Sequence, residues 1–462
     1  MASLPAPTLP APVPMAKLPR IPLWRLVRPA LKLRNGEIDG FRQVMEGVPG
    51  AFRVELPGQR VIVANDPDLV EELLVTKHKH YHKDPGYASL RRLMGNGLIT
   101  NEGKSHLTQR RMMQPAFHKK RIDEYAACMV GQARERSLRW RDGEPLDVNA
   151  EMSAVTLTII AKTMFDSDVA DDIERVYSAV TTVINHFERY VNPWVGRFFD
   201  ALPLESTRKI HEAERDLNEI IYRFIREHRE SGEDRGDLLS MLLMAQGEDG
   251  SGMSDQQVRD ESITLFLAGH ETTSLALTWT WYLLSKYPEV EARLHEELER
   301  VLPGGRPATA EDVPRLEYTR RVVTESMRIL PPVPAFGRQA ISNNQLGPYA
   351  VRRGDVVAVV PWALHMREEY FPEPDKFDPD RWLPERSANV PKFAYFPFGG
   401  GVRKCIGEPF AWMEAILLLA TFAQRWRLEL APDNRIAYDT KITLRPKFGM
   451  KMILRERGQA PD

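Results

Sequence analysis

The stretch FPFGGGVRKCIGEPFA, residues 396–411, is the most distinctive part of this sequence. Its glycines permit backbone conformations with positive φ and close approach to a flat ligand. Pro409 suits the first turn of a helix, which places Cys405 just before a helix N-terminus, where backbone N–H groups and the helix dipole favour a thiolate. Taken alone, a single cysteine is more often a small buried hydrophobe. A phosphate-binding loop is disfavoured because no Gly-Lys-Ser/Thr follows the glycines.

A second distinctive stretch, AGHETT at residues 268–273, lies inside a long predicted helix. Ser254 and Gln257 have capping-box spacing, and the helix runs to about Lys286, a length of nearly 50 Å at ~1.5 Å per residue. We expect the Thr272 hydroxyl to bond back to a carbonyl one turn earlier and to open the helix locally. An opened turn beside Glu271 and Thr272 suits water-mediated proton delivery, although a solvated Glu with two filler threonines is the simpler interpretation of this stretch alone.

A third pattern pairs Glu325 with Arg328 on a predicted helix, followed by Leu330-Pro331-Pro332 and later by FDPDRW at residues 377–382. Alone, such an i, i+3 pair is usually a surface ion pair that contributes under ~1 kcal/mol.

Taken in order, these motifs resemble those of the cytochromes P450, over about residues 23–462. Phe398-x-Gly400-Gly401-x-Arg403-x-Cys405-x-Gly407 looks like the family's heme-binding loop. The resemblance implies a mainly helical fold with a minor β region, with heme b (iron protoporphyrin IX) between the long helix and the cysteine loop. It also implies a monooxygenase that inserts one atom of O2 into an apolar small molecule. A peroxide-driven oxygenase or rearrangement enzyme of the same fold is the alternative, and a non-catalytic heme sensor is a third.

The resemblance also implies roles for individual residues. Cys405 is the iron ligand, Glu271 and Thr272 are the proton-relay pair, and His270 has a packing or hydrogen-bonding role. The implied structural triad is Glu325, Arg328 and Arg381, with Asp380 and Trp382 in place of the usual Glu and Phe. The implied heme contacts are His106 (where many members have Trp), Arg110, Arg338 and Arg403 at the propionates, with Ala268, Gly269, Phe398, Cys405 and Gly407 elsewhere. The expected substrate pocket comprises Leu98, Ile99, Phe187, Trp194, Ala268, Val333, Phe336 and Ile442.

The composition limits which kinds of binding partner and which cellular compartment we expect. Lys plus Arg (63) nearly cancels Asp plus Glu (64), so no global charge attracts nucleic acid or a membrane. Only Cys128, read as a buried core thiol, and Cys405 are present, which favours a reducing compartment. Prolines interrupt the uncharged opening segment, so neither a signal-peptide core nor a membrane helix is expected there. We therefore expect a cytoplasmic, soluble monomer without a membrane anchor.

Along the chain, residues 1–22 read as a Pro-rich arm and residues 23–462 as one domain. Residues 23–33 form an amphipathic segment with Arg25, Arg28 and Lys32 on its polar side. Residues 52–66 alternate about Pro57-Gly58 and predict a β-hairpin, and Asp66-Pro67 predicts the start of a helix. A last helix is expected at about 410–425, and a terminal β region at about 442–454.

The basic segments raise two further hypotheses. Fewer than sixty residues follow Cys405, which predicts that electrons come from a separate ferredoxin or flavodoxin. Arg111, Lys119, Lys120, Arg121 and Lys404 are the expected docking cations for that acidic partner, the alternative being an ordinary solvated basic helix. His78, His80 and His82 could hold zinc or copper, but no carboxylate or cysteine nearby completes the set, which favours a solvated basic loop.

Overall fold

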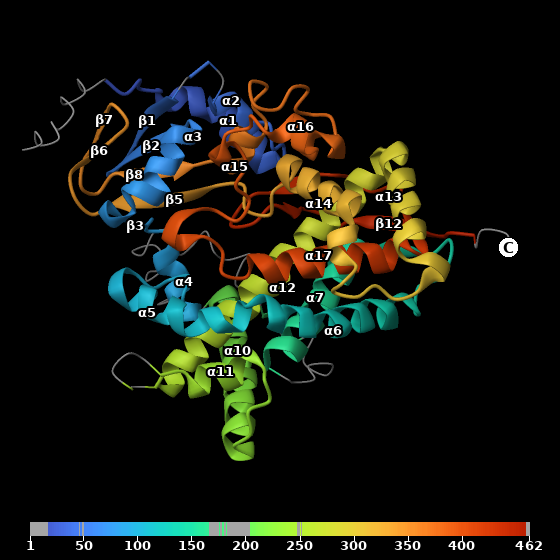
Figure 1. The fold of residues 1–462 in the computed structure, drawn as a ribbon. Helices are drawn as coiled ribbons and strands as arrows, with labels where there is room; N and C mark the ends of the chain where they lie inside the picture. The colour runs from blue at the N-terminus through green and yellow to red at the C-terminus, as the bar shows by residue number, and fades with distance from the viewer. Residues whose placement is uncertain are drawn as a thin grey trace, which may run out of the picture.

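The computed structural model describes residues 17–458, with gaps at 46, 49, 166–174, 176–177, 180–181, 183–203, 247–249 and 251. Helices make up most of it, with the largest sheet and α1 and α2 at one end (Figure 1), which confirms the predicted mainly helical class with a minor β component. The helices are α1 Leu23–Asn35, α2 Gly40–Met45, α3 Pro67–Glu71, α4 Tyr87–Met94, α5 Gly103–Met113, α6 Lys119–Ser137, α7 Val148–Phe165, α10 Glu205–Ser231, α11 Leu238–Met244, α12 Asp255–Lys286, α13 Pro288–Val301, α14 Glu317–Ile329, α15 Pro361–His365, α16 Pro384–Ser387 and α17 Glu408–Ala423.

The largest sheet has five strands in the order β1-β2-β8-β5-β3. The predicted hairpin is present as antiparallel β1 and β2, which turn at Pro57-Gly58. Asp66 then caps α3 by accepting the amides of Asp68 and Leu69. Strand β8 pairs parallel with β2 and antiparallel with β5, so it joins the N-terminal sheet to the segment after α14. The strands are β1 Gly50–Leu56, β2 Gln59–Asn65, β3 Tyr81–Lys83, β4 Pro145–Asp147, β5 Phe336–Ala340, β6 Asn344–Leu346, β7 Tyr349–Val351, β8 Val356–Val359, β9 Trp426–Leu430, β10 Tyr438–Asp439, β11 Arg445–Pro446 and β12 Lys451–Glu456.

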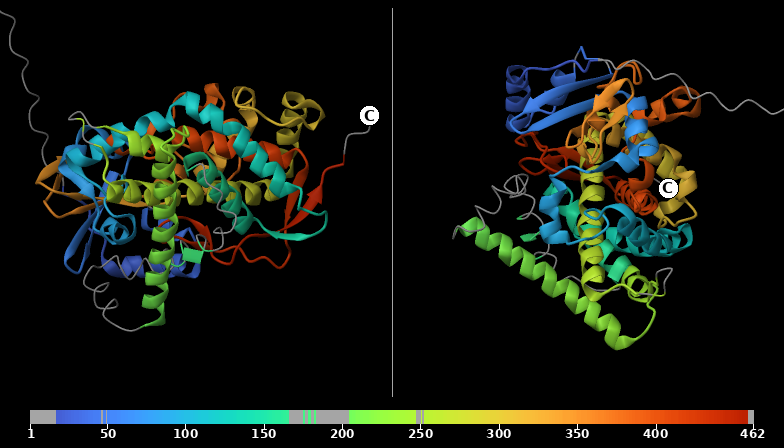
Figure 2. Two further views of the ribbon diagram at one scale, coloured as in Figure 1. Left: turned by 90° about the horizontal axis from the view of Figure 1, so that it is seen from below. Right: turned by 90° about the vertical axis from the view of Figure 1, so that its left-hand side faces the viewer.

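The long helix α12 runs through the middle of the molecule (Figure 2). Its N-cap is Ser254, whose hydroxyl accepts the Gln257 amide as predicted. Apolar and small residues occupy nearly every side of α12, and most of its length is buried, as expected for a core helix packed on all faces. The Thr272 hydroxyl donates to the Ala268 carbonyl at 2.9 Å. The helix is nevertheless continuous there, so the expected local opening is absent, because this bond is compatible with the regular i to i−4 geometry.

The segment 17–22, at the end of the predicted arm, already contacts the sheet. The Arg53 amide donates to the Pro19 carbonyl at 2.8 Å, and the Ile21 amide donates to the Arg53 carbonyl at 2.9 Å. The amphipathic segment that follows is helix α1, which extends to Asn35 and ends at Gly36 in the left-handed region. Helix α17 begins two residues before its predicted start, because Glu408 and Pro409 both belong to its first turn.

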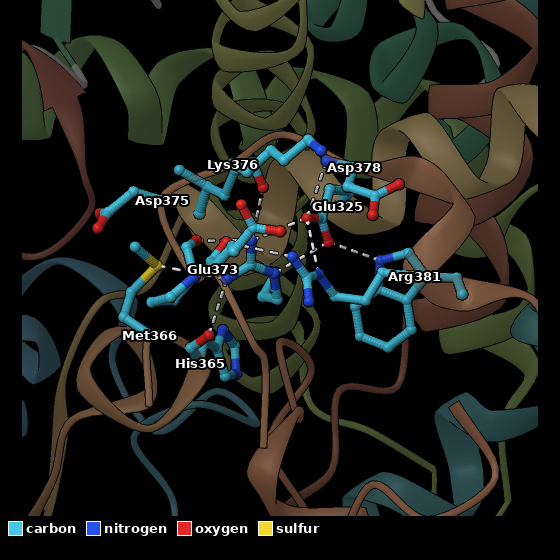
Figure 3. A network of polar contacts seen from close by, with 12 residues as sticks. Glu325, His365, Met366, Glu373, Asp375, Lys376, Asp378 and Arg381 are labelled. Atoms are coloured by element: carbon cyan, nitrogen blue, oxygen red, sulfur yellow. Dashed lines mark hydrogen bonds and ion pairs between the residues drawn. The ribbon is translucent and has the colours of Figure 1, made fainter. Parts of the chain in front are cut away.

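Buried charges hold α14 against the irregular segment 366–382 (Figure 3). The Glu325 carboxylate accepts two hydrogen bonds from Arg328, at 2.8 and 2.9 Å, and one from Arg381 at 3.2 Å. Arg328 also donates to the carbonyls of His365 and Pro374. Because every charge here has a partner and the side chains of Glu325 and Arg328 are fully buried, the network fixes this segment in one arrangement.

The two departures from the usual motif take part in this network. Trp382 donates its indole N–H to Glu325 at 2.8 Å, a bond that phenylalanine lacks. Asp380 pairs with Arg293 of α13 at 2.6 Å and with Arg321 of α14 at 2.7 Å. Both residues therefore add connections between the helices and the segment after them.

Candidate active site

One cavity lies between α12 and the cysteine loop, and its lining is largely apolar. Residues of both sequence motifs line it, among them Ala268, Gly269, Thr272, Thr273, Phe398, Arg403, Cys405 and Gly407. Of the expected substrate contacts, Leu98, Ile99, Ala268, Val333 and Phe336 line it, whereas Phe187 and Trp194 lie outside the described residues. Ile442 is not among the residues that line the cavity, and it packs against the main core.

The glycines of the cysteine loop adopt the expected positive φ at Gly399 and Gly401, and they pack closely against other parts of the protein. Gly401 has a φ of 64°, and a Cβ there would lie 1.9 Å from the backbone oxygen of Leu74, in the π-helix Glu72–Thr76. A Cβ on Gly400 would lie 2.5 Å from the ring of Phe393. The backbone is thus pressed between these two neighbours, and any side chain at Gly401 would be strained.

Cys405 is held at the end of this loop, deep in the molecule, with its side chain open to the cavity. Its amide donates to the Phe398 carbonyl at 3.0 Å. Burial raises the pKa of the Cys405 thiol above its ordinary value, while a backbone hydrogen bond from Gly407 and the positive charge of Arg110 lower it. The N–H contribution that the sequence suggested is therefore present, but burial outweighs it in the protein alone.

A group of cations surrounds one edge of the cavity. Arg110, Arg338 and Arg403 all line it, together with His106. Burial, then the positive charges of Arg403, Lys83 and Arg110, lower the pKa of His106 to about 3, so this imidazole is neutral. Arg403 donates to the Asn101 carbonyl at 2.7 Å and pairs with Glu102. These positively charged groups repel one another, so an anionic group bound at this edge of the cavity would relieve that repulsion.

Two further residues that line the cavity, Lys83 and Tyr87, were not predicted from the sequence. Lys83 is partly buried, and its removal from water together with the charges of Arg338 and Arg403 holds its pKa well below the usual range. Its ammonium lies 4.7 Å from the Tyr87 ring, and both side chains line the cavity. Lys83 directly follows the run 77–82 that contains the three histidines, which was interpreted as a solvated basic loop. In the structure, residues 81–83 form β3 and pair with β5.

On the opposite side, α7 approaches α12 closely at Gly269. A Cβ at Gly269 would lie 2.7 Å from Ile160 of α7, and Thr156 of α7 donates to the His270 carbonyl at 3.0 Å. This helix contact is the reason for a glycine in mid-helix. The His270 ring bonds to the Phe266 carbonyl and is buried beside the Phe266 ring, in agreement with its predicted packing and hydrogen-bonding role.

Glu271 does not face the cavity that Thr272 lines. Its carboxylate accepts the Thr443 hydroxyl at 2.5 Å and lies 2.6 Å from the Arg445 guanidinium. Consecutive residues on a helix point about 100° apart, so the two side chains of the expected acid–alcohol pair diverge. Arg445 is partly exposed, at 20%, and therefore connects Glu271 with solvent. Nothing in the local sequence near Glu271 marks this partner, which comes from β11.

A second buried acid, Glu414, belongs to α17, the helix that follows the cysteine loop. Its side chain is fully buried, and burial raises its pKa well above the usual range, with a smaller opposing contribution from Thr273. It is therefore a neutral carboxylic acid beside α12.

The loop that carries Leu98 and Ile99 is attached to the N-terminal half of α12 by two carboxylates. The Asn96 amide donates to Asp260 and the Leu98 amide donates to Glu261, each at 2.8 Å. A Cβ on Gly97 would lie 2.1 Å from the Thr264 hydroxyl oxygen, so the loop lies directly on the helix. Acidic residues in a buried helix are a signal that sequence analysis could have used.

Comparison with known proteins agrees with this arrangement. A sequence model described as Cytochrome P450 matches residues 19–451. The chain is 41% identical over 387 residues to cyclooctatin synthase of Streptomyces melanosporofaciens, which covers 83% of each protein. The chain belongs to the cytochrome P450 family. This P450 is also 35% identical to pentalenene oxygenase of Streptomyces avermitilis, over 79% of the chain and 81% of the relative.

The solved structures give the same result. The heme domain of cytochrome P450DA superimposes with a TM-score of 0.82 at 30% identity, covering 96% of this chain and 99% of that one. The chain is accordingly an oxidoreductase of the P450 monooxygenase family with a heme-iron cofactor. None of the helices in the described residues is long and apolar enough to span a membrane. The described residues also contain no cluster of His, Cys, Asp and Glu suited to a metal ion, at His78 to His82 or elsewhere.

Proposed function

We propose that this P450 inserts one oxygen atom from O2 into an apolar terpenoid, with heme b bound between Cys405 and Thr272. The observation that carries the proposal is the single cavity that both residues line, with mostly apolar side chains around it. The relatives named cyclooctatin synthase, cyclooctat-9-en-7-ol 5-monooxygenase and pentalenene oxygenase are terpene-oxidising P450s, which supports a terpenoid substrate class.

The residues present fit the cofactor. Cys405 offers the thiol sulfur for iron, and Arg110, Arg338, Arg403 and His106 offer donors and positive charge for two propionates. We add Lys83 to these propionate-binding residues. A bound anion would offset the repulsion from Arg338 and Arg403, which helps to lower the pKa of Lys83. Heme supplies the activation of O2, and a thiolate ligand favours O–O cleavage.

Proton delivery is divided between two side chains in this proposal. The Thr272 hydroxyl, which donates to the Ala268 carbonyl, holds a proton at the cavity wall. Glu271, held by Arg445 and Thr443, connects that turn of α12 to the partly exposed Arg445. Water between these groups would carry the proton, because their side chains point in different directions.

The electron donor is proposed to be a separate acidic protein of the ferredoxin or flavodoxin type. Lys120, at the start of α6, is exposed, and the described residues provide no ion pair for it. Lys119 and Arg121 pair with Asp123 and Glu124 one helical turn away, which reduces their net attraction for a partner. We therefore expect Lys120 to contribute more than either neighbour to the encounter.

Two measurements test the proposal. The reduced, carbon-monoxide-bound protein should show the strongly red-shifted Soret band of thiolate ligation, and Cys405→Ser should abolish it; a retained band would reject Cys405 as the ligand. A polycyclic diterpene should displace water from iron, with its characteristic spectral shift, at a lower concentration than a linear fatty acid of similar size. Tighter binding of the fatty acid would reject the terpenoid class while leaving the monooxygenase assignment in place.

The donor surface is tested separately. Lys120→Glu should slow turnover with NAD(P)H and a supplied ferredoxin system, more at low ionic strength than at high, because screening weakens the encounter. Peroxide-supported turnover should be unchanged, since it needs no partner. Arg134→Glu, an exposed cation of α6 about 20 Å farther along the helix, is the matched control. Equal slowing by both variants would reject docking at this end of α6.

A further inference from the structure

Helix α1 presents a stripe of large apolar side chains to solvent. Trp24 is 70% exposed, Val27 54%, Leu31 50% and Leu23 46%. These positions are spaced by three and four residues, so they share one side of the helix. Isolated exposed apolar residues are common on proteins, but several on one helical face mark an interaction surface.

The stripe faces outward because the other side of α1 is fixed to the protein. Gly40 of α2 packs so closely that a Cβ there would lie 2.6 Å from the Pro29 carbonyl and 2.7 Å from Leu33. At the C-terminal end, the Gly36 carbonyl accepts the Tyr438 amide at 3.0 Å. Rotation of α1 to bury the stripe would break both contacts.

A second segment extends the apolar surface. Phe448, between β11 and β12, is 56% exposed. Its neighbour Lys447 donates to the Arg34 carbonyl at the end of α1, at 2.9 Å, which places this turn beside the helix. We call Leu23, Trp24, Val27, Leu31 and Phe448 the α1 patch.

The charges around the patch are almost all positive. Helix α1 contains Arg25, Arg28, Lys32 and Arg34 and no acidic residue. The Arg435 guanidinium lies 5.5 Å from the centre of the Phe448 ring. One carboxylate, that of Glu37, lies 3.9 Å from the Lys32 ammonium. An apolar stripe with cations beside it is the pattern of helices that lie in the interface of an anionic bilayer.

We infer that the α1 patch binds the surface of an anionic lipid bilayer, with α1 parallel to the membrane plane and Trp24 inserted at headgroup level. No spanning helix is required, because such a helix buries only its apolar side. Association with a second copy is disfavoured by the charges, since a symmetric contact would bring the same cations together. Surface binding would place this P450 where apolar compounds concentrate, although the inference does not depend on the proposed substrate.

The test uses the heme-loaded, full-length protein and sedimentation with vesicles. Phosphatidylcholine vesicles containing about 30% phosphatidylglycerol should bind it at least tenfold more tightly than pure phosphatidylcholine, and about 0.5 M salt should weaken the binding. Val27→Glu with Leu31→Glu, and separately Trp24→Ala, should each reduce binding at least tenfold. Leu138→Glu is the matched control, because Leu138 is 65% exposed at the end of α6. Carbon-monoxide spectra and thermal melting of each variant exclude misfolding as the cause of a loss.

Three outcomes would overturn the inference. Equal weakening by Leu138→Glu would mean that binding does not depend on the patch. A dimer that forms without vesicles and is lost in the Val27→Glu, Leu31→Glu variant, with no vesicle binding by the parent, would assign the patch to a second copy. Vesicle binding that appears only after deletion of residues 1–16 would assign the patch to that segment of the chain.

Discussion

Glu261 of α12 is predicted to make the stability of this P450 strongly dependent on pH. Its side chain is fully buried; one carboxylate oxygen accepts the Leu98 amide and the other has no hydrogen-bond partner among the described residues. Burial raises its pKa to about 8; the Leu98 hydrogen bond opposes the increase and nearby Asp260 adds to it. The carboxyl group is therefore protonated in the folded protein over much of the neutral range.

The sign follows from this upward shift. When the pKa of an acid is higher in the folded protein than in the unfolded chain, ionisation favours the unfolded chain. The free energy of unfolding therefore falls as pH rises from about 4.5 to about 8. At about 1.4 kcal/mol per pKa unit, the loss is about 3 kcal/mol at pH 7 and about 5 kcal/mol above pH 8. Glu261→Gln cannot ionise and keeps an oxygen for the Leu98 amide, so it should match the parent near pH 5 and exceed its stability above pH 7.

Denaturant unfolding of both proteins between pH 5 and pH 9 measures this difference. The comparison must be of the two proteins, because His106 and His365, with pKa values lowered to about 3, make both lose stability on acidification. Subtraction removes that shared effect. A free energy difference that stays constant within about 0.5 kcal/mol from pH 5 to pH 9 would refute the assignment of Glu261 as a buried neutral acid.

Three further predictions concern the reaction and the core. Thr272→Ala should keep NAD(P)H consumption but lower product per NAD(P)H by about tenfold or more, with peroxide released; unchanged coupling would remove Thr272 from proton delivery. Arg445→Met should also lower coupling, because it removes the cation that holds Glu271, and Arg445→Lys should restore most of it; identical coupling in both variants would show that this contact has no part in proton delivery. Glu325→Ala should cost about 3–5 kcal/mol in unfolding free energy, since Arg328 and Arg381 are left buried without their carboxylate; a loss below about 1 kcal/mol would show that the network is not a source of stability.

The sequence predicted the features whose cause is local. The hairpin at Pro57-Gly58, the cap at Ser254 and the helix after Cys405 each follow from turn or capping chemistry within a few residues. The class of fold and the family followed from the motifs. Contacts between distant segments were not predictable in this way. Arg445 reaches Glu271 from β11, and Asp260 and Glu261 reach the loop at 96–98, through packing that no short pattern encodes.

The structure adds detail to two expectations about the site. Adjacent side chains on a helix diverge, so of Glu271 and Thr272 only Thr272 lines the cavity. Ile442, expected in the pocket, is not among the residues that line the cavity. Cys128, expected to be buried, is only partly so. Lys83 and Tyr87 were not predicted, because they lie outside the recognised motifs and follow a basic run, residues 77–82, that was interpreted as a solvated loop.

The contact between Gly401 and Leu74 has a consequence for the order of assembly. The cysteine loop packs against the backbone carbonyl of Leu74 in an early segment, and the N-terminal strand β2 likewise pairs with β8 of the C-terminal half. Contacts so distant along the chain form late in folding, because the entropy of closing the intervening loop must first be offset. Cys405, the proposed iron ligand, is therefore presented in this position only when both segments are in place.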